Sequence, residues 1–444
     1  MPTLKDPLDS RWFPELHKIT SVIASIAWLP EGLGLEKQRA QFLEKSIRNP
    51  YFTYPSLHAE DLERQLHSLA RLEEQLFEGE DHPIVREAYR WKLDELRAKI
   101  NMFIASARDD MDEFQRHSEA VFGAPSPATF RWTVDAIHEL VDVAAGHDSP
   151  IIQSAALTLR SSLPDIEVTA PIFIPPDKTI QKVFAALQAH AQPLLNIPTT
   201  KHWKGEAVHK IFQEALEKVG MSDWEVATET GRYYVSVEHG DSKKIRLPAT
   251  RTFTRFKLLA LLVHEIGVHI VRAENGRQSP LLLLSKGLDR YERGEEGLAT
   301  LYEEALRGSF QELIRPERYL AFGLTMGLDG TPRDFRDVYE IVYQYFYLRA
   351  LLAGRTESTA HIRAQRRAWE TCLRVFRGTD GQTKGVCFTK DLLYQDGNIS
   401  LWHALHHHPE EINRLLAGKY DPANPRHRWV LDQLNITTHT TFSK

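Results

Sequence analysis

The feature that most constrains this chain is the segment LLVHEIGVHIVR, residues 261–272, where two histidines and a glutamate interrupt an apolar helix. Burying imidazoles and a carboxylate among leucines and valines is costly unless these polar groups find a partner. His264, Glu265 and His269 are therefore typical of a site that holds a cation. The simpler alternative is a pair of hydrogen-bonded core histidines.

The spacing of the two histidines predicts a distortion of this helix. Each α-helical residue turns by about 100°, so positions four apart share a face, whereas positions five apart diverge by about 140°. His264 and His269 are five apart, one more than in the H-E-x-x-H metal motif. A π-bulge absorbs one extra residue and would bring both rings to one face. Gly267, between them, weakens the α-helix by about 1 kcal/mol relative to alanine, so we expect the bulge there.

A third ligand is expected from GEEGLATLYEEALRG, residues 294–308, because catalytic zinc sites commonly have three protein ligands and one open position. One face of this predicted helix carries Glu296, Ala299, Thr300 and Glu303. The small side chains on that face would let it approach the histidine helix closely. Glu296 is thus the predicted third ligand. Glu295 points about 100° away and is expected in the first turn as a partner of the helix dipole.

HEIGVH followed by EEGLA resembles the pattern of a known family. Its members are the bacterial QEGLA-motif proteins, described as flavohaemoglobin expression-modulating, and their eukaryotic relatives, the microtubule-associated tyrosine carboxypeptidases. The family pattern is H-E-x-x-x-H followed by a helix beginning Q/E-E-G-L-A, and Glu295 stands where many members have glutamine. The resemblance also covers RVFRG (374–378) and TKDLLYQDG (389–397), and it extends loosely over about residues 170–430.

This resemblance implies a zinc metallopeptidase with His264, His269 and Glu296 as the ligands of Zn²⁺ and Glu265 as the general base. Two neutral imidazoles and one carboxylate suit zinc. The resemblance further implies a carboxypeptidase that hydrolyses the C-terminal peptide bond of a peptide or protein. Because the eukaryotic relatives remove a C-terminal tyrosine, tyrosine or another aromatic residue is the implied leaving residue.

A carboxypeptidase has to hold the terminal carboxylate of its substrate, and arginine or lysine is suited to that task. The two segments that resemble the family contain suitable side chains: Arg374, Arg377 and Lys390 as cations and Tyr394 as a hydroxyl donor. The alternative for each of them is a structural loop with surface charges.

Two other functions compete with a carboxypeptidase. One is a metal-dependent amidase or endopeptidase acting on a small substrate. The other is a non-catalytic regulatory protein with a structural metal and an inert Glu265. A carboxylate directly beside a ligand favours the enzymes, because a structural site needs neither an open coordination position nor a base.

The expected fold class is α+β, mostly helical, with a zincin-like metallopeptidase domain and a small sheet preceded by a helical N-terminal region. The predicted domains are residues 1–165 and 166–444. The leucine pattern of residues 59–107 predicts two antiparallel helices broken near Gly79–Pro83. Further helices are expected at 179–192, 205–219 and 252–274. Strands are expected at 224–230, 233–239 and 244–250, with a strand-like piece at 166–176 and an irregular or stranded piece within 374–397.

The composition excludes several classes of protein. With 444 residues, 42% of them hydrophobic, the chain can bury a sizeable core. The formal net charge of −5 is spread over charges of both signs, so we expect no nucleic-acid partner. Only two cysteines, an N-terminus without an apolar signal region and no long apolar run lead us to expect a cytoplasmic protein without a membrane span. No feature predicts an oligomeric state.

Overall fold

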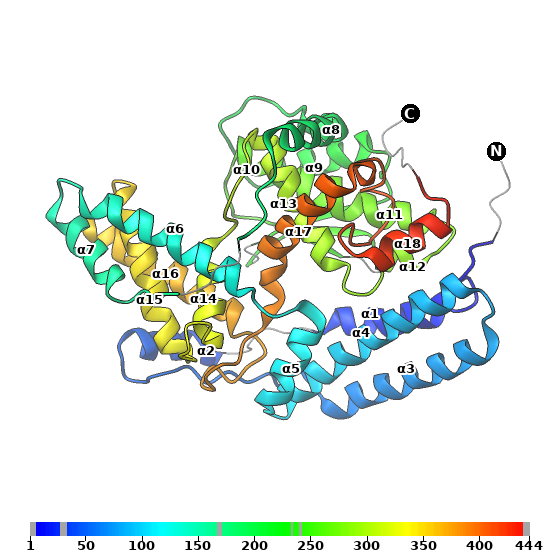
Figure 1. The fold of residues 1–444 in the computed structure, drawn as a ribbon, viewed down its shortest axis with the longest axis horizontal. Helices are drawn as coiled ribbons and strands as arrows, with labels where there is room; N and C mark the ends of the chain where they lie inside the picture. The colour runs from blue at the N-terminus through cyan, green and yellow to red at the C-terminus, as the bar shows by residue number, and fades with distance from the viewer. Residues whose placement is uncertain (1–5, 27–32, 167–170, 232–233, 239–241, 438–444) are drawn as a thin grey trace.

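The computed structural model describes residues 6–26, 33–166, 171–231, 234–238 and 242–437, and it is a mostly helical α+β fold, as predicted. Figure 1 shows the helices α6, α7, α15 and α16 grouped at one end of the molecule, with α3 and α4 along another side. In the described part of the chain, no helix is both long enough and apolar enough to cross a membrane.

The first third of the chain is helical. Its helices are α1 (Phe13–Ser25), α2 (Leu33–Leu43), α3 (Ala59–Gly79), α4 (Pro83–Ala107), α5 (Met111–Phe122), α6 (Pro127–Ala145) and α7 (Pro150–Arg160). The predicted pair in residues 59–107 is confirmed as α3 and α4. The leucines at positions 62, 69, 72 and 76 form the buried stripe of α3. Pro83 begins α4 because proline at the first helical position removes only an N–H that has no partner there.

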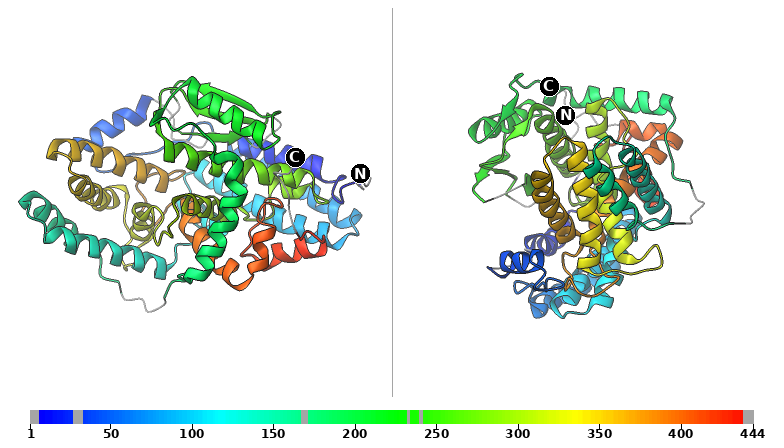
Figure 2. Two further views of the ribbon diagram at one scale, coloured as in Figure 1. Left: turned by 90° about the horizontal axis from the view of Figure 1, so that it is seen from above. Right: turned by 90° about the vertical axis from the view of Figure 1, so that its left-hand side faces the viewer.

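A small sheet precedes the histidine helix, as predicted. Its strands are β2 (Glu225–Glu229), β3 (Ser236–Glu238) and β4 (Lys244–Pro248), in the order β2-β4-β3, with β4 parallel to β2 and antiparallel to β3. Ile245 lies beside both Val226 and Val237 in the register. A second pair joins β1 (His202–Trp203) to β5 (Phe253–Thr254). Figure 2 shows the three-stranded sheet at one edge of the molecule, on the opposite side from α18.

The helices α8 (Asp177–Leu195) and α9 (Glu206–Lys218) agree with prediction. The segment predicted at 252–274 is one helical rod of three parts: α10 (Arg255–Leu261), η1 (Leu262–Ile270) and α11 (Val271–Arg277). Thr254 caps its N-terminus by accepting a hydrogen bond from the backbone N–H of Lys257. The middle part, η1, is a π-helix.

The rest of the chain is helical. Its elements are α12 (Leu283–Lys286), α13 (Glu292–Arg307), α14 (Pro316–Met326), α15 (Phe335–Leu352), α16 (Glu357–Val375), η2 (Thr389–Leu392), α17 (Leu393–His407), η3 (Pro409–Asn413) and α18 (Pro425–Gln433). The piece expected to be irregular or stranded within 374–397 contains no strand: this segment is the end of α16, an irregular loop, η2 and the start of α17. The strand expected at 166–176 is wrong for residues 171–176, which are irregular, and its residues 167–170 lie outside the described residues.

Two buried hydrophobic clusters hold these elements together. The first joins the N-terminal helices to α14, α15 and α16, and there the ring of Phe42 packs 5.3 Å, centroid to centroid, from that of Phe335. The second contains the sheet, α8, α9, the helical rod formed by α10, η1 and α11 (the histidine rod), α13 and α17. The first cluster therefore draws on both sides of residue 165, and the division of the chain at that residue remains a prediction.

Two glycines let α13 and α17 cross in backbone contact. A Cβ atom added at Gly297 would lie 2.5 Å from the backbone carbon and oxygen of Gly397, and one added at Gly397 would lie 2.3 Å from the backbone oxygen of Arg293. Real Cβ atoms do not approach backbone atoms this closely. The glycines of EEGLA and of TKDLLYQDG thus face one another, although they are 100 residues apart.

Candidate metal centre

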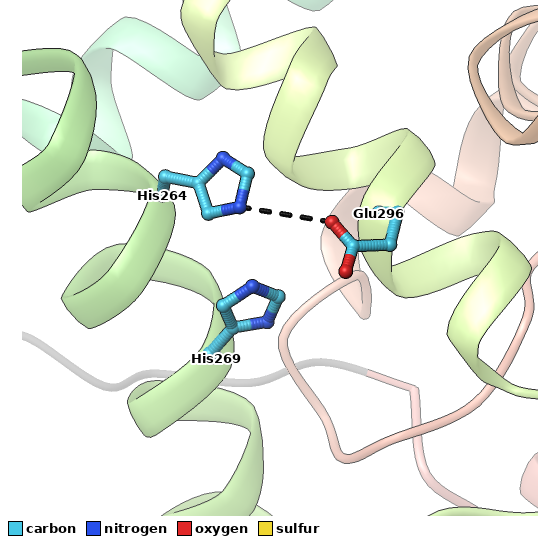
Figure 3. A group of neighbouring side chains, drawn as sticks. All are labelled: His264, His269 and Glu296. Carbon is cyan, nitrogen blue, oxygen red and sulfur yellow. Dashed lines mark ion pairs between the residues drawn. The ribbon is translucent and has the colours of Figure 1, made fainter. Parts of the chain in front are cut away.

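The structure brings His264, His269 and Glu296 together. One possible ligand atom from each of the three lies within 4.8 Å of the others. The two imidazole rings lie 4.9 Å apart, centroid to centroid, and Figure 3 shows the Glu296 carboxylate pointing toward them from the neighbouring helix. The side chains are only 11%, 12% and 17% exposed, so a cation held between them would be largely removed from water.

The π-helix explains how histidines five residues apart share a face. A π-helix hydrogen-bonds each residue to the fifth along the chain and so takes up one residue more per turn than an α-helix. The expected bulge is confirmed, and it extends over the nine residues of η1. Gly267 is buried within it, where an added Cβ would come 3.1 Å from Cδ1 of Leu194.

A carboxylate from α13 orients His264. Its Nδ1 lies 3.0 Å from Oε1 of Glu303. Burial alone would raise the pKa of Glu303, but the hydrogen bond and the charge of His264 lower it, so this carboxylate is ionised and can only accept. Nδ1 therefore carries the proton, and Nε2, which lies 3.7 Å from Oε2 of Glu296, presents a lone pair to the centre of the cluster.

A second carboxylate from α13 orients His269. Nδ1 of His269 lies 2.8 Å from Oε1 of Glu295, and Glu295 also accepts hydrogen bonds from Lys419 and from Arg272. Burial opposes the charged form of Glu295, but these two cations and His269 hold its pKa far below the ordinary value. Glu295 does lie in the first turn of α13, as expected, but its side chain is a buried partner of a histidine.

The donor set fits a divalent cation. Oε2 of Glu296 is buried and has no hydrogen-bond partner among the described residues, an arrangement that is costly unless a cation is bound. Two imidazoles and one carboxylate, each histidine backed by a further carboxylate, are the donor types typical of a catalytic zinc site.

Glu265 lies beside this cluster without belonging to its ligand set. Burial is the largest cause that raises its pKa, and the neighbouring Glu296 and Glu303 carboxylates act in the same direction. The charges of His264 and His269 oppose that rise. A half-buried carboxylate next to the group of His264, His269 and Glu296, called the metal-type cluster below, has the position that a general base requires.

Two of the basic residues that the sequence indicated for substrate binding, Arg374 and Arg377, lie near Asp391 of η2. Asp391 forms ion pairs with Arg318, at 2.7 Å, and with Arg374, at 3.5 Å. Arg377 places its guanidinium 4.7 Å from the ring centroid of Phe388, and its buried Nε has no hydrogen-bond partner in the described part of the chain.

The other two indicated residues lie in η2, which holds Lys390, and in the first turn of α17, which holds Tyr394. The Nζ of Lys390 is 3.4 Å from Oε1 of Glu292, so Lys390 neutralises a carboxylate at the beginning of α13. Tyr394 lies toward the metal-type cluster: burial raises the pKa of its hydroxyl, and the charge of Glu296 raises it further. The guanidiniums of Arg315 and Arg318 lie 4.7 and 5.6 Å from its ring centroid.

Several of these partners had no assigned role in the sequence. The sequence indicates the correct face of the helix for Glu303 but no partner, and it indicates no role for Arg272, Lys419 or Arg315. A sequence signal for Arg272 does exist, because it is a charged residue three positions after His269 in an apolar segment. No such sequence signal exists for Lys419 and Arg315, since both reach the site from loops.

Comparison with known proteins adds the family context. A family model described as "Microtubule-associated tyrosine carboxypeptidase" matches residues 177–434, which is more than half of the chain. The mouse protein "Microtubule-associated tyrosine carboxypeptidase 1" is 26% identical over 156 residues, which cover 34% of this chain and 29% of the mouse protein. The match thus spans under a third of that relative's length. No solved structure matches.

Proposed function

The chain belongs to the family of microtubule-associated tyrosine carboxypeptidases, and we propose that it is a zinc-dependent carboxypeptidase that removes the last residue of a peptide or protein. The observation that supports this most is the cluster of His264, His269 and Glu296, in which a buried carboxylate oxygen has no partner among the described residues. The zincin-like character of residues 166–444 belongs to the same proposal, as does tyrosine, or another aromatic residue, as the residue removed.

In this proposal His264, His269 and Glu296 hold the metal. A bound zinc ion would lower the pKa of a coordinated water to about 7 and polarise the scissile carbonyl. Glu303 and Glu295 keep the two imidazoles in the tautomer that presents Nε2.

Glu265 is the proposed proton carrier. Its carboxylate accepts a proton from the attacking water and then gives it to the amine of the departing residue. Glu265 is half-buried and directly follows His264, which keeps its carboxylate beside the reacting groups. Arg374, Arg377, Lys390 and Tyr394 are proposed to supply the positive charge and the hydroxyl that favour the C-terminal end of a substrate.

The test compares wild type with Glu265→Gln, which keeps the shape of the side chain and removes its basicity. We expect about one zinc per chain in both proteins, measured by elemental analysis after purification without chelator. Mass spectrometry of a peptide library should show C-terminal trimming by wild type and at least a 1000-fold slower rate for the variant, since it lacks the base.

Other results of that experiment would change the assignment. Cleavage within the peptides would favour an endopeptidase. Zinc in both proteins with no cleavage by either would favour a structural metal. Absence of zinc from both would mean that the histidines are core residues, and the proposal would fail.

A further inference from the structure

Arg315 is held in an uncommon backbone conformation beside the metal-type cluster. Its φ and ψ angles are 54° and 56°, the left-handed region, which residues with a Cβ atom rarely adopt. It lies just before Pro316, the first residue of α14. Such conformations persist only where the surroundings enforce them, and they concentrate at ligand-binding positions.

A buried glutamine from α17 holds the loop that leads into this conformation. Gln395 is 2% exposed; its side-chain oxygen accepts a hydrogen bond from the backbone N–H of Ile314, and its Nε2 donates to the backbone oxygen of Glu312, at 3.1 Å. The loop that ends at Arg315 is thus attached to the helix that carries Tyr394. This attachment fixes where the Arg315 side chain begins.

The guanidinium of Arg315 contacts an aromatic ring and no acid. It lies 4.7 Å from the ring centroid of Tyr394 and is half-buried. Among the described residues, none forms a hydrogen bond or ion pair with it. By contrast, Arg318 and Arg374 are already paired with Asp391. A half-buried guanidinium without an acidic partner is available to an incoming anion.

The packing of α17 against α13 places Arg315 near the metal-type cluster. Tyr394, whose ring Arg315 contacts, lies about one helical turn before Gly397, and Gly397 meets Gly297, the residue after Glu296. Burial would lower the pKa of Arg315, but Tyr394, Glu303, Asp391 and Glu296 together outweigh burial and raise it. Glu296 is a proposed metal ligand, and Glu303 accepts a hydrogen bond from His264, another proposed ligand. Arg377 instead places its guanidinium over the ring of Phe388.

We propose that Arg315 binds the C-terminal carboxylate of the substrate, in an inference that rests on the proposed carboxypeptidase function. In such an enzyme the terminal carboxylate and the scissile carbonyl are separated by a single residue, about 3.5 Å of extended chain. The residue that holds the carboxylate therefore lies close to the metal ligands. Arg315 meets this requirement, and its forked donors match a carboxylate in two parallel hydrogen bonds.

The experiment uses two peptides that differ only at the end, a free carboxylate in one and a carboxamide in the other, in a sequence that wild type trims. We expect Arg315→Ala to lower kcat/KM on the free acid about 100-fold, mainly through KM, and to change the value for the amide less than 3-fold. Arg315→Lys should recover part of the loss, because it restores the charge without the fork. Arg and Ala both carry a Cβ, so the backbone requirement at φ 54° is the same in both proteins.

Arg307→Ala is the matched control, because it removes the same charge from an exposed position at the end of α13. This variant should leave kcat/KM for both peptides unchanged. Zinc content and thermal midpoint, measured for every variant, show whether the protein is folded and loaded.

Binding separates this inference from the proposed function. In the Glu265→Gln protein the acid should bind more tightly than the amide, and adding Arg315→Ala should abolish that preference. If wild type trims nothing, the carboxypeptidase proposal fails, while an acid preference that depends on Arg315 still supports a carboxylate site. If trimming occurs and Arg315→Ala keeps the acid-over-amide ratio, or if the parent binds both peptides equally, the role of Arg315 is refuted.

Discussion

At the scale of single residues, the candidate centre depends on carboxylates that do not touch the metal position. Glu303 and Glu295 each bind the Nδ1 of one histidine, and both project from α13, the helix that also supplies Glu296. One helix therefore provides one proposed ligand and the partners of the two other proposed ligands. Such partners fix the orientation of the imidazole and raise its basicity, so they contribute to metal affinity without contact.

We expect Glu303→Gln to weaken zinc binding about 10- to 100-fold, because a neutral amide holds the Nδ1 proton of His264 less strongly. The dissociation constant is measured by competition with a chromogenic chelator. Glu312→Gln is the control, since its side chain is exposed. An affinity for the Glu303 variant within 2-fold of wild type would show that this hydrogen bond does not support the metal.

At the scale of elements, the position of the ligands depends on how closely the helices approach. The π-helix η1 turns both histidines to one side, and α13 lies close enough to reach them. On its other side α13 crosses α17 where Gly297 meets Gly397. The glycine of the EEGLA motif is thus required for packing, next to a glutamate that faces the site.

We expect Gly297→Ala to lower the free energy of unfolding by at least 2–3 kcal/mol, because its Cβ would lie 2.5 Å from the Gly397 backbone and overpacking at that contact forces the helices apart. Urea unfolding measures the change. Gly146→Ala serves as the comparison, since the nearest atom to its Cβ would be 3.7 Å away, and it should change stability by less than about 1 kcal/mol. Equal midpoints for both variants would mean that the crossing is looser than described.

At the scale of the whole molecule, a buried set of charges joins the N-terminal helices to the site. Glu292, at the start of α13, forms ion pairs with Lys390 of η2, at 3.4 Å, and with Lys99 of α4, at 3.7 Å. Burial would raise the pKa of Glu292, but Lys390, Lys99 and Lys92 lower it to about 2. The carboxylate is therefore charged at neutral pH and links three parts of the chain.

This network predicts a specific loss of stability in acid. The pKa of Glu292 in the folded protein is below its ordinary value of 4.5. Its contribution to the free energy of unfolding is therefore complete above pH 4.5 and disappears as the pH falls toward 2. Glu292→Gln should lower the free energy of unfolding by about 3 kcal/mol at pH 7. It should also make that free energy depend less on pH in acid, as measured by urea unfolding at several pH values. Glu87→Gln, which breaks a surface pair with Arg90, should cost under about 1 kcal/mol. Parallel pH profiles for wild type and the Glu292 variant would contradict the assignment.

The sequence was enough to locate most of the elements and the centre of the site. The leucine pattern predicted α3 and α4, and a helix was expected over the rod α10–η1–α11, since these elements depend on residues near one another in the chain. The π-helix followed from counting residues between His264 and His269, because the rotation per residue is a property of the helix itself. The sequence left an irregular or a stranded piece open within 374–397, and no strand forms there because the apolar residues of this segment pack into the core from helices and loops.

Only the tertiary structure decided which residues complete the site. Lys419 reaches Glu295 across 124 positions and Gln395 holds the loop before Arg315 across 81, and no local pattern encodes such contacts. They depend on how closely α13 can approach α17, and that distance is set by two glycines in separate motifs. Ligand types and helix rotation can be derived from the chain alone, whereas hydrogen-bond partners, charge balance and the availability of Arg315 exist only once the helices are packed.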